Sequence, residues 1–217
     1  MSAHAALITA VQSGSLEKIR AMLREDPALA SAKDAKGVSA VMHAFYTRQP
    51  QIAELLVAAK PDLDIFEAAA DGNRDRVSQI LDSNPEAAKH WSADGFTALH
   101  FAAFFNRPDI ARNLIRHGAE VDAASHNAMR VTPLHSAAAA HSREILRLLL
   151  EQGASPDARQ QGGWTALHAA AQNGDAEMVR DLLQHQADVP ARNDDGKTPS
   201  DVAAEKGYMA VVEMLSK

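Results

Sequence analysis

Three histidines recur at nearly constant spacing, and they raise the first question of chemistry because imidazole is a common zinc ligand. Each histidine closes a Thr-x-Leu-His motif, and the intervals between them are 35 and 33 residues. Zinc needs every ligand nitrogen within about 2.1 Å, whereas equivalent residues of stacked units lie about 8–10 Å apart. We therefore predict no metal site and no cofactor, and we expect the ring nitrogens to fasten neighbouring turns. These residues are His100, His135 and His168.

A candidate phosphate-binding loop occupies Ala191–Thr198 and ends in Gly196-Lys197-Thr198. A P-loop wraps phosphates with the backbone N–H groups of glycine residues, and it follows a buried strand. Here an alanine takes the place of the first glycine, and Asp194 and Asp195 would bring negative charge against the phosphates. The preceding segment reads as a helix and a turn. The alternative of a nucleotide-binding enzyme centred on these residues is therefore disfavoured.

Other catalytic signatures are missing from the sequence. There is no Gly-x-Ser-x-Gly, no His-Glu-x-x-His and no cysteine, the usual carriers of nucleophilic or metal-assisted catalysis. The paired carboxylates of Asp194 and Asp195 fall in an expected exposed turn, whereas an acid–base pair needs burial to separate the two pKa values. The sequence predicts a protein that is not an enzyme, with no small-molecule substrate.

Composition narrows the classes of partner. The 217 residues carry 22 Lys+Arg against 28 Asp+Glu, a formal charge of -6, which argues against nucleic acid or an anionic membrane as the main partner. No stretch reaches the apolar length of a membrane helix, and the N-terminus lacks the basic region of a signal peptide. The absence of cysteine is compatible with a reducing compartment, so we expect a cytoplasmic protein.

The elements that must position these residues are short helices in pairs. Each Thr-x-Leu-His copy reads as a helix start, with the threonine as N-cap. Small residues and a turn follow, and then a second helix with apolar residues at helical spacing, as in Ile145, Leu148 and Leu149. The turn position favours a left-handed residue, which glycine adopts without strain. The turn residues in chain order are Gly14, Arg48, Gly72, Asn106, His141, Gly174 and Gly207.

This pattern resembles the ankyrin repeat family. The match is strongest in 96–123, 131–159 and 164–192, where the motif approaches Thr-Pro-Leu-His-x-Ala. The resemblance implies an all-α solenoid of about seven helix-turn-helix units with short β-hairpin turns. The leucine position of the motif recurs at intervals of 34, 24, 34, 35, 33 and 33 residues, so one hairpin is missing near residue 62. That position is held by Leu7, Val41, Ile65, Leu99, Leu134, Leu167 and Ser200.

A second repeat of 58 residues indicates a duplicated two-unit module, 7–64 and 65–122, followed by units 123–159, 160–192 and 193–217. We expect residues 1–217 to form a single ankyrin-repeat domain. No flexible linker separates Val57 from Ile65, so the stack should be continuous across Lys60–Asp64.

In proteins that this chain resembles, hairpin tips and first helices line a concave groove that grips another protein. The chain carries a dense aromatic cluster there. Helical spacing turns the small Ala102 and Ala103 toward the neighbouring units, so Phe101, Phe104 and Phe105 cannot all be buried against those units, and some of these rings should be exposed. The alternative is that these rings are packing residues that fill a gap beside the third unit, which lacks the Thr-x-Leu-His start. We predict a monomeric protein-binding module, an adaptor or stoichiometric inhibitor; a purely structural spacer is the remaining possibility. The predicted partner-binding residues are Tyr46, Phe96, Phe101, Phe104, Phe105, Met129 and Trp164.

Overall fold

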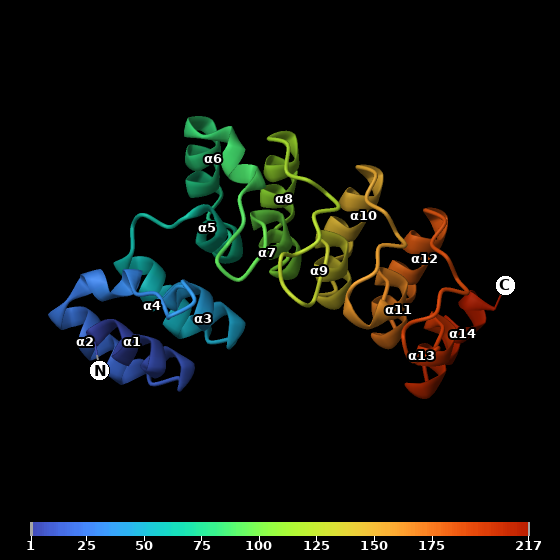
Figure 1. Ribbon diagram of the computed structural model, residues 1–217, viewed down its shortest axis with the longest axis horizontal. Coiled ribbons are helices and arrows are strands. Elements are labelled where there is room, and N and C mark those ends of the chain that lie inside the picture. The colour runs from blue at the N-terminus through green and yellow to red at the C-terminus, as the bar shows by residue number, and fades with distance from the viewer. Residues whose placement is uncertain (1, 217) are drawn as a thin grey trace.

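The structure is a computed structural model, and it describes residues 2–216. Seven antiparallel helix pairs follow one another along the molecule, and the described residues contain no β-strand (Figure 1). The predicted all-α repeat solenoid is therefore confirmed. The pairs are α1 (Ala3–Gln12) with α2 (Leu16–Glu25), α3 (Ala40–Tyr46) with α4 (Pro50–Ala59), α5 (Ile65–Asp71) with α6 (Arg74–Ser83), α7 (Ala98–Phe104) with α8 (Pro108–Arg116), α9 (Pro133–Ala139) with α10 (Arg143–Glu151), α11 (Ala166–Gln172) with α12 (Ala176–Gln184), and α13 (Pro199–Glu205) with α14 (Met209–Leu215).

The turn inside every pair contains a residue with positive φ, as the sequence predicts. Glycine holds this position in four pairs, but Arg48, Asn106 and His141 adopt φ values of 54°, 53° and 56° in the other three. The spacing of the seven turn residues matches the spacing of the predicted leucine positions. The repeat register read from the sequence is therefore correct in all seven units.

Loops that resemble hairpins connect most pairs. In each of these loops a backbone N–H at the start of the loop donates a hydrogen bond to a backbone carbonyl near its end. Two loops also contain an isolated antiparallel bridge, Lys33 with Ser39 and Trp91 with Thr97. Three short 3-10 helices lie in the connections, Pro27–Ser31, Pro85–Lys89 and Gln161–Gly163. The closing bonds run from Asp34 to Val38 (2.9 Å), Ser92 to Phe96 (2.8 Å), Ser125 to Val131 (2.7 Å), Gln160 to Trp164 (2.9 Å) and Asn193 to Lys197 (3.0 Å).

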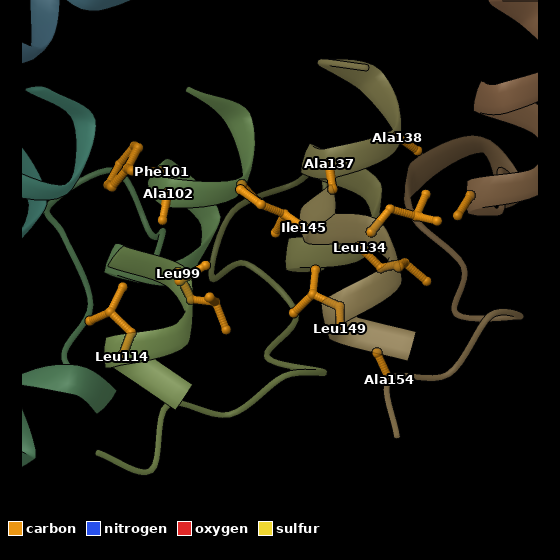
Figure 2. Close-up of a cluster of buried hydrophobic side chains, with 14 of the residues drawn as sticks. Leu99, Phe101, Ala102, Leu114, Leu134, Ala137, Ala138, Ile145, Leu149 and Ala154 are labelled. Carbon is orange, nitrogen blue, oxygen red and sulfur yellow. The ribbon is translucent and has the colours of Figure 1, made fainter. Parts of the chain in front are cut away.

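The core consists of leucine, isoleucine and alanine side chains that stack between successive units. Figure 2 shows units 4 and 5, whose buried side chains include Leu99 and Leu114 in one unit and Leu134 and Ile145 in the next. All four side chains are fully buried. Small residues such as Ala102 let the inner helices approach closely, and each buried leucine contributes about 1.5–3 kcal/mol relative to an exposed one.

The junction between the second and third units differs from the others. Lys60–Asp64 replaces a full hairpin connection. The buried core divides near it into a smaller N-terminal cluster and a larger C-terminal one, which also takes in Val38 and Met42 of the second unit. The inner helices α3 and α5 pack against each other, whereas α4 and α6 do not pack as the other consecutive outer helices do (Figure 1). The predicted packing across the junction is thus confirmed for the inner helices, whereas the row of outer helices is interrupted between α4 and α6.

A buried ion pair lies at this junction. Lys60, which caps α4, donates from Nζ to both carboxylate oxygens of Glu67 in α5, at 2.9 and 2.7 Å. Glu67 also accepts from the backbone N–H of Asp64 at 3.0 Å, which completes a capping box. Both charged side chains are buried. Each buried charge is neutralised by the other, and breaking the pair would leave an unpaired charge in the core. The pair therefore links the end of one unit to the start of the next.

Candidate functional site

The three motif histidines are structural. In α7, His100 Nδ1 accepts from the backbone N–H of Thr97 at 3.1 Å, and its Nε2 donates to the carbonyl of Val131 in the next loop at 2.9 Å. His135 and His168 make the same contacts with the carbonyls of Trp164 and Lys197. Each histidine thus fastens the following loop, as predicted. Burial lowers the pKa of all three, and that of His100 to about 4, so the rings are neutral near pH 7.

The Gly196-Lys197-Thr198 segment is a helix start. The hydroxyl of Thr198 caps α13 and donates to Asp201, which holds the place that histidine has in the preceding repeats. Lys197 pairs through Nζ with Glu205 at 2.7 Å. The lysine is therefore engaged with its own repeat, and the segment follows an irregular turn after α12.

An apolar groove of about 350 Å³ lies across the second, fourth and fifth units. We call it the aromatic groove. Phe104 and Met129 are its most exposed walls, with 42% and 46% of their surface accessible. A single exposed apolar side chain is ordinary on a protein surface, whereas several that line one hollow form a contiguous apolar patch of the kind that marks contact sites. The lining residues are Tyr46, Asp94, Phe96, His100, Phe101, Phe104, Met129 and Ser136.

The aromatic groove owes its form to the missing hairpin of the third unit. Tyr46, at the end of α3, donates its hydroxyl to the Asp94 carboxylate in the loop before α7. Burial, together with the neighbouring carboxylate, raises the pKa of Tyr46, so the phenol stays protonated. The Phe45 and Phe105 rings lie 5.3 Å apart across the same boundary. The second unit therefore reaches the fourth directly, and both contribute walls to the groove together with Met129 and Ser136 of the fifth unit.

Five of the seven predicted site residues line the aromatic groove: Tyr46, Phe96, Phe101, Phe104 and Met129. Phe101 forms the floor, with only 4% exposed and the rings of Phe96 and Phe66 at 5.7 and 6.2 Å. The structure does not bring Trp164 into the groove; its half-buried indole lies 5.6 Å from the His168 ring.

Phe105 lies in an adjoining hollow of about 680 Å³, which shares the Phe104 side chain with the aromatic groove. Arg48, at the left-handed turn after α3, also lines this hollow. Sequence reasoning placed Ser136 on the groove-facing first helix of its unit, but it did not identify Asp94 or His100 as groove residues. Spacing within one repeat cannot show that Asp94 meets a tyrosine 48 positions earlier.

Two features that define other functional classes are absent from residues 2–216. No cluster of three or more histidine, cysteine, aspartate or glutamate side chains in this part of the chain could hold a metal ion. None of its helices has the length and apolar character needed to cross a bilayer.

Comparisons with known proteins agree with this architecture. A family model described as ankyrin repeats, in three copies, matches residues 65–160 and again 153–217. A stretch of 56 residues is 41% identical to Palmitoyltransferase AKR1 of Yarrowia lipolytica, which is 26% of this chain and 8% of that protein. The chain thus spans a small part of that relative's length. Ankyrin repeats generally mediate protein–protein interaction and are typically not enzymes. Since the family model covers more than half of the chain, the protein belongs to the ankyrin repeat family.

Proposed function

We propose that this chain is a non-enzymatic module that binds one partner protein through the aromatic groove, as an adaptor or a stoichiometric inhibitor. The observation that supports this most is the exposure of Phe104 and Met129 over an aromatic floor. Interface hot spots combine such apolar anchors with pockets that exclude water. A purely structural spacer has no use for such a groove.

The surroundings of the groove favour a rigid binding site. The Phe101 ring is packed by other rings on several sides, and the Tyr46–Asp94 bond holds the far wall in place. A preorganised surface loses little side-chain entropy on association, so more of the contact energy appears as affinity. The proposal also includes a monomeric state. It includes a cytoplasmic location as well, with which the cysteine-free sequence is compatible.

Affinity capture with a matched pair of variants tests this function. Phe104→Ser removes an exposed apolar wall of the groove. Met209→Ser removes an even more exposed apolar side chain, 64% accessible, at the start of α14 and outside the groove. We expect quantitative mass spectrometry to find a protein retained by the native chain and by Met209→Ser but reduced about tenfold or more with Phe104→Ser. Equal capture by all three chains would contradict the proposal.

A further inference from the structure

Within residues 2–216, the lining of the aromatic groove carries a single charged side chain, and it is an anion. That side chain is Asp94, and the other lining residues are aromatic, apolar or neutral. His100 is neutral near pH 7 because burial lowers its pKa to about 4, and the Tyr46 phenol stays protonated. Asp94 forms no ion pair in this part of the chain. The groove therefore has a negative charge that no cation of the protein balances.

Hydrogen bonds from neutral donors fix Asp94 in place. One carboxylate oxygen accepts from Ser92 Oγ at 2.6 Å, and the other accepts from the Tyr46 hydroxyl. The Asp94 carbonyl accepts from Asn127 Nδ2 at 2.9 Å. Hydroxyl donors satisfy hydrogen-bonding capacity but leave the charge in place. The carboxylate thus attracts a cation, although it offers few free acceptor positions to N–H donors.

Aromatic rings surround the floor of the groove. The Phe101 ring lies 6.3 Å from the Tyr46 ring at 42° and 5.7 Å from the Phe96 ring at 63°. Phe104 adds an exposed wall to the same hollow. The faces of aromatic rings carry negative charge density and attract a cation within about 6 Å of the ring centroid. A cation that enters the groove therefore meets several rings as well as the carboxylate.

We propose, on the basis of the proposed function, that the partner binds the aromatic groove through a trimethyllysine side chain. The quaternary ammonium lies against the aromatic rings, in the field of the Asp94 carboxylate. The hydrocarbon stem of the same side chain packs along Phe104 and Met129, as lysine stems do on apolar surfaces. A volume of about 350 Å³ is small among ligand sites, which range over about 300–1,000 Å³, and it suits one side chain.

The chemistry of the groove selects this occupant over three others. A carboxylate would be repelled by Asp94. A purely hydrocarbon side chain would remove water from the Asp94 carboxylate without supplying an opposite charge. An unmethylated lysine or an arginine supplies the charge, but its N–H donors would lose hydration and find few acceptors. A quaternary ammonium carries the positive charge and has no N–H group to satisfy.

Titration of the full, ¹³C-labelled chain with small probes, followed by NMR of its aromatic rings, tests the inference. The probes are the N-acetyl methylamides of trimethyllysine, of lysine and of the uncharged analogue in which carbon replaces the quaternary nitrogen. We expect trimethyllysine to shift the Phe96, Phe101 and Phe104 resonances saturably. The uncharged analogue has the same shape and should bind about tenfold more weakly, and lysine should bind more weakly still.

Variants of the protein give the complementary measurement. Asp94→Asn keeps an oxygen that accepts from the Tyr46 hydroxyl but removes the charge, and it should weaken trimethyllysine about tenfold. Asp195→Asn is the matched control, because Asp195 is exposed and directly precedes Gly196 as Asp94 precedes Gly95. Phe104→Leu keeps an apolar wall without a ring, and it should weaken trimethyllysine more than the uncharged analogue. Thermal melting of each variant confirms that it is folded.

The outcomes separate this inference from the proposed function. Equal affinity for trimethyllysine and its uncharged analogue would overturn the inference and leave the groove as an apolar protein-binding site. Choline that binds as tightly as the trimethyllysine probe would indicate a free or lipid headgroup and overturn the assignment to a partner's lysine. An absence of ring shifts with every probe would also overturn the inference. Capture with Phe104→Ser then decides the proposed function separately.

Discussion

At the scale of single residues, the motif histidines do structural work that depends on their charge. Each ring accepts through Nδ1 and donates through Nε2, which requires the neutral form. Burial lowers the pKa of His100 to about 4, below its value of about 6.5 in an unfolded chain. Between these two values the unfolded chain binds more protons than the folded one. The stability that the neutral ring supplies is present above about pH 6.5 and is lost as the pH falls toward 4.

His100→Gln should reduce this pH dependence. Glutamine at this position can still reach the backbone N–H of Thr97, but it does not titrate. For the native chain, we expect the part of the unfolding free energy due to His100 to fall by about 3 kcal/mol between pH 7 and pH 4. Urea unfolding at several pH values measures the slope. His4→Gln, at an exposed position, should keep the native slope. An unchanged slope in His100→Gln would show that this ring is not protonated on unfolding.

The left-handed turn residues carry strain that glycine would relieve. His141 has φ 56°, and its side chain is exposed with one long contact, 3.4 Å, to Asp175. We expect His141→Gly to raise the free energy of unfolding by about 0.5–1 kcal/mol, since glycine adopts this conformation freely. His141→Ala keeps the Cβ atom and should give no gain. Equal effects of the two substitutions in urea unfolding would refute the strain argument.

At the scale of elements, the sequence predicts the repeats well. The N-cap residues, the apolar periodicity and the turn positions each follow from local chemistry, so the helix pairs and their register are visible in one repeat at a time. The paired elements at an offset of 58 residues, such as α2 with α6 and α3 with α7, agree with the predicted duplication. The duplication itself stays a prediction.

The junction between units could not be predicted in the same way. Periodicity identifies the buried face of each helix but not the direction in which a shortened connection turns the next unit. Lys60 and Glu67 show the consequence, because both belong to segments that lack the usual motif. Their pairing depends on how α4 and α5 meet, which local sequence does not determine.

Removal of Lys60 should be costly. Lys60→Met leaves the fully buried Glu67 carboxylate without its cation, and we expect a loss of about 3–5 kcal/mol in unfolding free energy. Lys60→Met combined with Glu67→Gln should recover part of the loss, because glutamine is uncharged and still accepts from Asp64. Lys18→Met, at an exposed lysine of α2, is the control. A change below about 0.5 kcal/mol for Lys60→Met would mean that the pair does not hold the junction.

At the scale of the whole molecule, the aromatic groove lies where the two clusters of the core meet. Phe45 packs against both clusters, and its neighbour Tyr46 reaches the loop of the fourth unit. Aromatic density predicted the region of the groove, but not which rings would be exposed. That division depends on contacts between units. Tyr46 of the second unit and Phe66 of the third lie beside the ring of Phe101, which is buried, whereas Phe104 stays open.

The most direct test compares binding with folding in Phe104→Ala and Phe105→Ala, using the partner identified by capture. Calorimetric titration should show that Phe104→Ala weakens binding about thirtyfold or more, equivalent to about 2 kcal/mol. Its urea unfolding midpoint should stay close to that of the native chain. Phe105→Ala should lower the midpoint, because its half-buried ring packs on Phe45. Intact affinity in Phe104→Ala, together with a large loss of stability, would contradict the account and make the ring part of the core.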